Sequence, residues 1–264
     1  MQVRQLDAPG APFDQGATQG RTFADALRAL AHEQDLLAGG WLQRRSMARA
    51  ARRGPALAML RYTLQLHERL QGIAAGARLG VARLELLATL TRTSGVASVS
   101  GSELESRLDL APELESLLLL RRSAPDAVGL RTLELCTVAL PGCIAGLNER
   151  GVGLVVLRDR DIAQIPLHAL AQDTLTRATD LDAALAHVEL RAFYAGGTGE
   201  ILLADATGRA VQVVLEAGRF TSRPVVARSH PVAESTLRLD LRAAALTYCA
   251  SDGSEHRVEL GKVE

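Results

Sequence analysis

The sequence predicts an α+β protein in which two mostly antiparallel sheets pack together and helices cover them on the outside. The hydrophobic period is helical up to Thr91 and changes to two after it. Two more helical segments, expected within 164–190, then interrupt the strands. Helices and strands segregated in this way, without a regular βαβ alternation, are typical of the α+β class.

The first third of the chain is expected to be helix. In "RTFADALRALAHEQDLLAGG" apolar side chains recur at helical spacing, and Gly39–Gly40 can end this helix. The stretch "PALAMLRYTLQLHERLQGIAAGARLG" predicts a second, long helix, with Pro55 in its first turn and Gly80 at its end. The stretch "VARLELLATL" predicts a third, shorter helix.

Strands are expected after Thr91, first at "GVASVSG", "ELESRLDL", "ESLLLLRR", "LRTLELCTVAL" and "GVGLVVL". The two later helices are "PLHALAQDTLTRA" and "DLDAALAHVE", and Asp180 is suited to cap the second. The final strands are "EILLAD", "RAVQVVLE", "RPVVARS", "STLRLDLRA", "ALTYCAS" and "EHRVEL", with a hairpin turn at "ADATGRA".

Length and composition favour a single domain over residues 1–264. It would have a helical part at 1–92 and a sheet-rich core at 93–264. The chain has 264 residues, 47% hydrophobic, enough for a sizeable core. Its formal net charge of zero argues against a nucleic-acid binder. No apolar run reaches the roughly 18 residues of a membrane span, so we expect no membrane partner and a cytoplasmic location.

The cysteines and histidines do not predict a metal or cofactor site. Cys136, Cys143 and Cys249 form no CxxC pair, and the six histidines show no HxxxH or HxH spacing. We interpret the cysteines as buried, reduced thiols and expect no cofactor.

Four phrases of the sequence resemble the isopenicillin-N acyltransferase family. "GAPFDQGATQGRTFADAL" resembles the family's opening "G-x-P-(F/Y)-x-x-G-x-x-x-G". "LQGIAAGARLGVARLELLATLTRT" is similar to "I-x-G-(I/M)-A-x-G-A" followed by "L-N-x-R-T". "AGLNERGVGLVV" and "EILLADATGRAVQVV" resemble "G-x-N-x-A-G-(L/V)-A-V" and "Y-(L/I)-L-A-D-x-x-G-x-A". The phrases follow the family's order over roughly residues 8–230.

The resemblance implies a four-layer αββα sandwich of the N-terminal nucleophile hydrolases. Members of this family cut their own chain before a cysteine, and the freed cysteine then attacks amides or thioesters. The new α-amine, with a pKa of about 7.7–8.0, serves as the base for the nucleophile on the same residue. A small-molecule amide or acyl thioester would then be the ligand, and a protein partner or a homo-oligomer is left open.

The family's functional residues match this chain incompletely. The family's "G-C-T" falls on Gly95-Val96-Ala97, so Val96 stands where the nucleophile is expected. Asp109 matches an aspartate that supports the nucleophile, and Asn148 matches the asparagine of "G-x-N". In "ARSHP", Ser229 replaces an oxyanion asparagine and His230 matches the last histidine of "H-T-N-H". The helical insert that carries a further active-site arginine is missing after His230.

A hydroxyl nucleophile remains as an alternative. If Gly101-Ser102 form a two-residue turn, Val96 faces Arg107 and Ser94 faces Asp109. This register favours Ser94 or Thr93 as the nucleophile, whereas the Gly-x-Thr phrase favours Val96. Ser94 is also suited to an ordinary helix-to-strand boundary.

Three functional hypotheses follow. The first is a non-catalytic or strongly diverged relative that keeps the fold and a pocket. The second is an active amide hydrolase or acyltransferase that uses Ser94 or Thr93. In the third, Asp109 or His230 acts as a general base without a covalent intermediate.

Overall fold

A computed structural model describes residues 3–37, 57–90, 94–109, 116–126, 129–159, 166–195, 198–216, 219–225, 236–250 and 252–261. Its strands form one hydrogen-bonded network that divides at β7 (Val152–Asp159) into two sheets. β7 pairs with strands of the larger sheet on both sides and meets the smaller sheet through one residue pair, Ser94 with Arg158.

The larger sheet contains eight strands in the order β1-β4-β5-β6-β7-β8-β9-β10. β1 pairs with β4 in parallel, and the other pairs are antiparallel. Besides β7, its members are β1 (Arg4–Pro9), β4 (Leu118–Ala124), β5 (Thr132–Thr137), β6 (Ala145–Asn148), β8 (Gly199–Asp205), β9 (Ala210–Glu216) and β10 (Arg219–Pro224).

The smaller sheet is antiparallel throughout, in the order β2-β3-β11-β12-β13. Its strands are β2 (Ser94–Ser100), β3 (Glu103–Asp109), β11 (Thr236–Asp240), β12 (Ala245–Cys249) and β13 (Glu255–Glu259). It packs face to face on the larger sheet, with β12 against β5 and β6, where Leu246 and Tyr248 are fully buried. Leu-rich inner faces on both sheets make this packing favourable.

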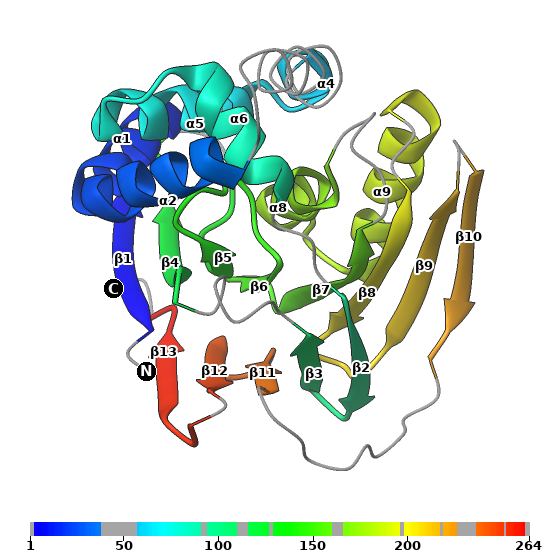
Figure 1. Ribbon diagram of the computed structural model, residues 1–264. Helices are drawn as coiled ribbons and strands as arrows, with labels where there is room; N and C mark the ends of the chain where they lie inside the picture. Colours follow the sequence, from blue (N-terminus) through cyan, green and yellow to red (C-terminus); the bar gives the residue numbers. More distant parts are fainter. Residues whose placement is uncertain are drawn as a thin grey trace.

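Helices cover the other face of the larger sheet (Figure 1). Helix α1 (Pro12–Thr22) contacts β1, α8 (Leu167–Arg177) contacts β6 and β7, and α9 (Leu181–Ala195) contacts β8 and β10. The remaining helices pack around α5 (Leu64–Ala77), and they are α2 (Ala24–Leu37), α4 (Leu57–Tyr62) and α6 (Val81–Leu90).

Helices α1 and α5 cross at glycine-lined surfaces. A Cβ on Gly72 would lie 2.0 Å from the Phe13 carbonyl oxygen, and one on Gly16 would lie 2.0 Å from the Arg69 carbonyl oxygen. Side chains at these positions would collide with backbone, so glycine is what lets the two helices approach. The crossing gives a physical reason for the glycines in the two N-terminal phrases.

The α+β class and the two packed, mostly antiparallel sheets are confirmed. The described residues supply the helical layer on the larger sheet, but they form no such layer over the smaller one. There the outer face presents Glu105, Arg238 and Arg257, all about half exposed. Among the described residues, no helix is long and apolar enough to cross a membrane.

Several elements differ from the sequence-based expectation. Residues 4–9 form strand β1 instead of belonging to a purely helical part. The long helix expected from Pro55 to Gly80 is divided at Thr63, whose backbone angles of φ −140° and ψ 58° are not helical. β6 was not expected. β10 covers Arg219–Pro224, so it begins four residues before the expected strand "RPVVARS", whose residues 226–229 lie outside the described part of the chain.

Other details match. The backbone N–H of Ala183 donates to the Asp180 carboxylate at 2.8 Å, which confirms Asp180 as the cap of α9. The turn between β8 and β9 lies at "ADATGRA", where Gly208 has φ +90°. The expected stop at Gly39–Gly40 and the first turn at Pro55 lie outside the described residues.

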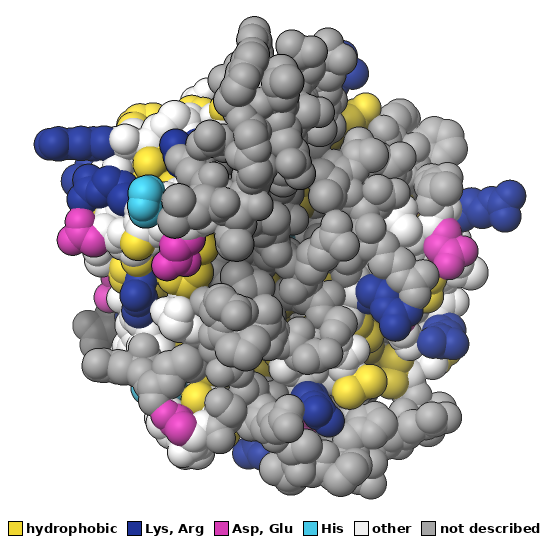
Figure 2. Space-filling view, in the orientation of Figure 1, with side chains coloured by type: hydrophobic (Ala, Val, Ile, Leu, Met, Phe, Trp, Pro, Cys, Tyr) yellow, Lys and Arg dark blue, Asp and Glu magenta, His cyan; other side chains and the backbone are white. Residues whose placement is uncertain are grey.

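Charged side chains are spread over the visible surface. On the face shown in Figure 2, Lys and Arg side chains alternate with Asp and Glu side chains around the rim. Neither sign forms a continuous patch there among the described residues.

Candidate functional site

The β2–β3 hairpin has the register that the sequence predicts. Gly101 and Ser102 form its turn, with Gly101 at φ +58°, and Ser100 pairs with Glu103. Val96 pairs with Arg107, and Ser94 pairs with Asp109. The hairpin therefore brings the backbones of Ser94 and Asp109 to the same position of the ladder.

Val96 faces a cleft, not the core. The residue is 53% exposed and lines a cavity of about 470 Å³ together with Gly95, Ala97 and Ser98. Val96 offers no nucleophile and no proton. Ser98 carries the one hydroxyl among the described residues that line this cavity, and none of them is His or Cys.

The opposite wall of this cleft is a chain of polar side chains on the larger sheet. Arg223 on β10 donates to the side-chain oxygen of Gln212 from Nε at 3.2 Å and from Nη2 at 3.0 Å. Gln212 in turn donates to Glu200 at 2.8 Å, and Arg158 lies 3.8 Å from the same carboxylate. The wall can offer hydrogen bonds and charge to a ligand.

This wall lies on the face of the larger sheet that looks toward the smaller one. One row of paired residues runs across the sheet from β5 to β9, and its side chains share a face. The row consists of Leu135, Ala145, Val155, Leu202 and Gln212. The larger sheet continues past β2 as β8, β9 and β10, and the cleft lies where the smaller sheet ends.

Asn148 does not point into this cleft, so that expectation is wrong. Asn148 pairs with Thr132, which lies three residues before Leu135 on β5. Side chains alternate between the two faces along a strand, so this odd separation places Asn148 on the opposite, helix-covered face. Its amide nitrogen donates to the carbonyl oxygens of Leu175 at 2.9 Å and Ala178 at 2.7 Å. Its side-chain oxygen accepts from the backbone N–H groups of Arg150 and Val152.

All the polar atoms of the Asn148 side chain are therefore engaged with backbone. Asn148 joins the β6–β7 turn to the end of α8, which is a structural role. The other predicted site residues, Ser229 and His230, lie outside the described residues, as does Thr93. For Ser94 and Asp109 the structure describes the backbone register.

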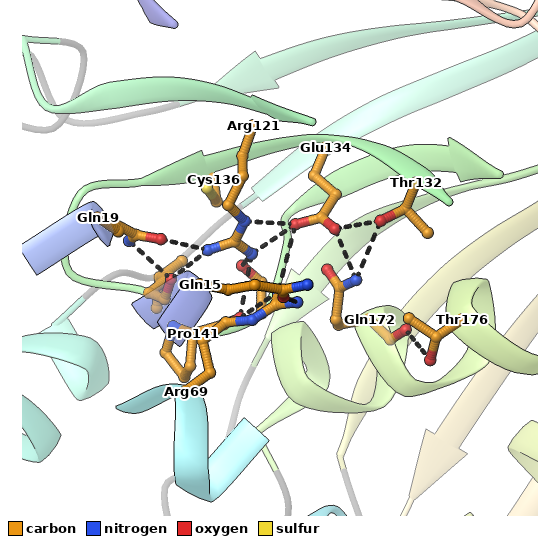
Figure 3. A network of polar contacts seen from close by, with 12 residues as sticks. Gln15, Gln19, Arg69, Arg121, Thr132, Glu134, Cys136, Pro141, Gln172 and Thr176 are labelled. Carbon is orange, nitrogen blue, oxygen red and sulfur yellow. Dashed lines mark hydrogen bonds and ion pairs between the residues drawn. The ribbon is translucent and has the colours of Figure 1, made fainter. Parts of the chain in front are cut away.

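A buried polar cluster that was not predicted from the sequence lies on the helix-covered face (Figure 3). Arg121 on β4 and Glu134 on β5 are fully buried and form an ion pair of 2.5 Å. Arg69 on α5 lies 3.7 Å from the same carboxylate. Glu134 also accepts hydrogen bonds from Thr132 and, at 2.6 Å, from Gln172 on α8.

The remaining donors of the two arginines reach main-chain and glutamine oxygens. Arg121 donates to Gln19 at 2.6 Å and to the carbonyl oxygens of Leu140, Pro141 and Gly142. Arg69 donates to Gln15 and, at 3.1 Å, to the Pro141 carbonyl oxygen. The cluster thus ties α1, α5 and α8 to strands β4 and β5.

Burial and neighbouring charges shift the pKa values of Glu134 and Arg69. Burial alone would raise the pKa of Glu134, but the charges of Arg121 and Arg69 and the hydrogen bonds it accepts lower it overall. Burial, together with the charge of Arg121, lowers the pKa of Arg69 to about 10. At neutral pH the three groups therefore carry two positive charges and one negative charge.

A sequence signal for the cluster was present. "LLLLRRSA" and "TLELCT" place Arg121 and Glu134 inside otherwise apolar runs. Charged side chains are seldom fully buried unless they are paired. Two opposite charges in two adjacent buried strands therefore predict a buried ion pair.

The nearby thiols are not arranged as nucleophiles. Burial raises the pKa of Cys136 to about 11 and that of Cys143 well above its usual range. Across the described part of the chain, no group of three or more His, Cys, Asp or Glu side chains is placed to hold a metal ion.

Comparisons with known proteins leave the family open. No protein-family model matches the chain, and no curated protein matches it in sequence. Among solved structures, penicillin V acylase from Agrobacterium tumefaciens is similar at 10% sequence identity. The match covers 64% of this chain and 79% of that chain, with a TM-score of 0.39. A likeness of this extent establishes neither a family nor an activity.

Proposed function

We propose that this chain is a non-catalytic, or strongly diverged, relative of acyltransferases and hydrolases that act on amides and thioesters. The family phrases of the sequence support the relationship. The observation that carries the proposal is Val96, which matches the nucleophile position and lines a cleft without any reactive group of its own. Loss of the nucleophile removes a covalent route.

In this proposal the cleft beside β2 keeps a binding role. Its wall of Glu200, Gln212 and Arg223 offers both hydrogen-bond donors and acceptors. A small amide or acyl thioester is the ligand class that suits the resemblance and this wall. Three free cysteines also support a location in the reducing cytoplasm.

The second candidate function is an active amide hydrolase or acyltransferase with Ser94 as its nucleophile. The register that pairs Ser94 with Asp109 favours it, because a supporting carboxylate is expected near the nucleophile. It requires the chain to be cut before Ser94, since only a free α-amine there could accept the hydroxyl proton.

Intact mass separates the two candidates. The full chain is expressed, and its mass is compared with that of Ser94→Ala and of Ser100→Ala, a control on the same strand that lies outside the cleft. All three proteins are then assayed on a panel of amides and acyl-CoA thioesters. We expect one uncut chain and no turnover. Two fragments that meet at Thr93/Ser94, or turnover lost in Ser94→Ala but kept in Ser100→Ala, would establish Ser94 as the nucleophile.

A further inference from the structure

A second cavity lies beside the buried polar cluster, on the opposite face of the larger sheet from the β2 cleft. Its volume is about 250 Å³, and its walls come from α1, α5, α8 and the end of β4. Gln15, Arg69, Ser123 and Gln172 contribute polar side chains to the wall. Gly10 and the exposed Asp126 lie at its rim.

Three residues that line this cavity each have a buried polar atom without a hydrogen-bond partner in the described structure. These atoms are Nε of Arg69, Oγ of Ser123 and the side-chain oxygen of Gln172. The three residues are at most 4% exposed. Buried polar groups in folded proteins are almost always hydrogen-bonded, and each exception calls for an explanation. Three exceptions in residues that line one cavity indicate a ligand that supplies the missing partners.

The other polar atoms of the Arg69 and Gln172 side chains are held by neighbouring groups. Arg69 is held through both terminal nitrogens by Gln15, Pro141 and Glu134. Gln172 is held through its nitrogen by Glu134. The side chains of Arg69, Gln15 and Gln172 converge below Glu134 (Figure 3).

The charge balance selects an anion. Arg69, Arg121 and Glu134 are buried and together leave the cluster with one positive charge in excess. Asp173, which also lines the cavity, is already compensated by Arg177 at 2.8 Å and Arg191 at 3.2 Å, and it is hydrogen-bonded to His187 at 2.9 Å. The Asp126 carboxylate is exposed at the rim, where water screens its charge.

We propose that this cavity binds a small organic carboxylate that also carries a hydroxyl or amine. The carboxylate accepts hydrogen bonds from Arg69 Nε and the Ser123 hydroxyl, and the hydroxyl or amine donates to the Gln172 oxygen. A charged acceptor makes the first two bonds stronger than neutral ones. The small volume, below the roughly 300–1,000 Å³ of pockets for drug-sized ligands, restricts the ligand to few atoms. The site is independent of the proposed function at β2.

The test uses three probes that differ by one group each. Glycolate has a carboxylate and a hydroxyl, acetate has the carboxylate alone, and ethylene glycol has hydroxyls alone. Binding to the full chain is followed by amide chemical shifts in NMR titrations. We expect saturable binding of glycolate in the millimolar range, weaker binding of acetate and no saturation with ethylene glycol. The shifts should centre on Ser123 and Gln172.

Variants locate the site. Ser123→Ala should weaken glycolate about tenfold, since it removes one hydrogen bond to a charged group. Thr137→Val is the matched control, because the Thr137 hydroxyl is equally buried and unpartnered but lines no part of this cavity. Ser123→Cys, which keeps the size and weakens the donor, serves if Ser123→Ala does not fold.

Four results would overturn the proposal. Absence of saturable binding by either carboxylate would mean that the cavity holds water only. Ethylene glycol binding as well as glycolate would remove the role of charge. Unchanged affinity in the folded Ser123 variant, or an equal loss in Thr137→Val, would place the ligand elsewhere.

Discussion

Replacing Glu134 by glutamine tests whether the buried cluster holds the helices on the larger sheet. Glu134→Gln keeps the shape of the side chain and removes its charge. Arg121 and Arg69 then lose the carboxylate that compensates them, at 2.5 Å and 3.7 Å. The new amide group also directs N–H donors toward guanidinium groups that are donors themselves, or loses its bond from Gln172.

The expected cost follows from full burial. Removing one partner of a buried ion pair typically destabilises a protein by about 3–5 kcal/mol, because the other charge is left uncompensated away from water. Here two arginines share the carboxylate, and both are at most 4% exposed. We therefore expect Glu134→Gln to lower the free energy of unfolding by about 3–5 kcal/mol, a large part of the roughly 5–15 kcal/mol available to a domain.

Urea unfolding followed by circular dichroism measures this loss. Glu149→Gln is the matched control, since Glu149 pairs with Arg131 at 2.8 Å while both side chains remain about one quarter exposed. It should cost less than about 1 kcal/mol. Because the folded pKa of Glu134 is lowered, its contribution is complete above the ordinary pKa of 4.5 and is lost as the pH falls through the folded value. A loss below about 1 kcal/mol, or one equal to that of Glu149→Gln, would refute the stabilising role of the cluster.

Three further predictions follow from single contacts. Gly72→Ala should destabilise the protein by at least about 1–3 kcal/mol in urea unfolding, because the new Cβ would meet the Phe13 carbonyl oxygen at 2.0 Å. Gly80→Ala is the control and should change the free energy of unfolding little, because a Cβ at Gly80 would have no atom within 4 Å. Burial lowers the pKa of His168 to about 3, so the stability that depends on neutral His168 is complete above the unfolded pKa of 6.5. The free energy of unfolding should fall by about 2–3 kcal/mol between pH 6.5 and 4.5, and His168→Gln should remove this pH dependence. A folded His168 that titrates near 6.5 by NMR would contradict this prediction. Asn148→Ala should lower the free energy of unfolding by about 2–4 kcal/mol, because two backbone carbonyl oxygens and two backbone N–H groups lose their partner. An unchanged midpoint of unfolding would show that water replaces the Asn148 side chain.

Local patterns predicted most of the fold because the two hydrophobic periods are well separated along this chain. The β2–β3 register followed from a two-residue turn at Gly101-Ser102, and the cap of α9 followed from Asp180, since both are set by neighbouring residues. β1 was missed because its burial alternates only weakly and its partner β4 lies far along the chain. The break at Thr63 also has no glycine or proline to mark it.

The candidate site was predictable only where it depends on local register. The match of Asn148 to a family phrase gives a sequence position but says nothing about which face of the sheet the residue occupies. That face is set by the pairing of β6 with β5, where Asn148 opposes Thr132. The buried cluster combines residues from three helices and two strands, so no single stretch could reveal it. The unpartnered atoms of its cavity became visible only from the packing of α1, α5 and α8.

The parallel pairing of β1 with β4 affects how the chain folds as it is synthesised. Arg4 pairs with Leu119, so the first strand leaves the ribosome on the order of ten seconds before its partner is translated. Helices α1 and α5 can already join through their glycine surfaces during that interval, but the sheet that covers their apolar side does not yet exist. The nascent amino-terminal third therefore exposes apolar surface until β4 and β5 emerge.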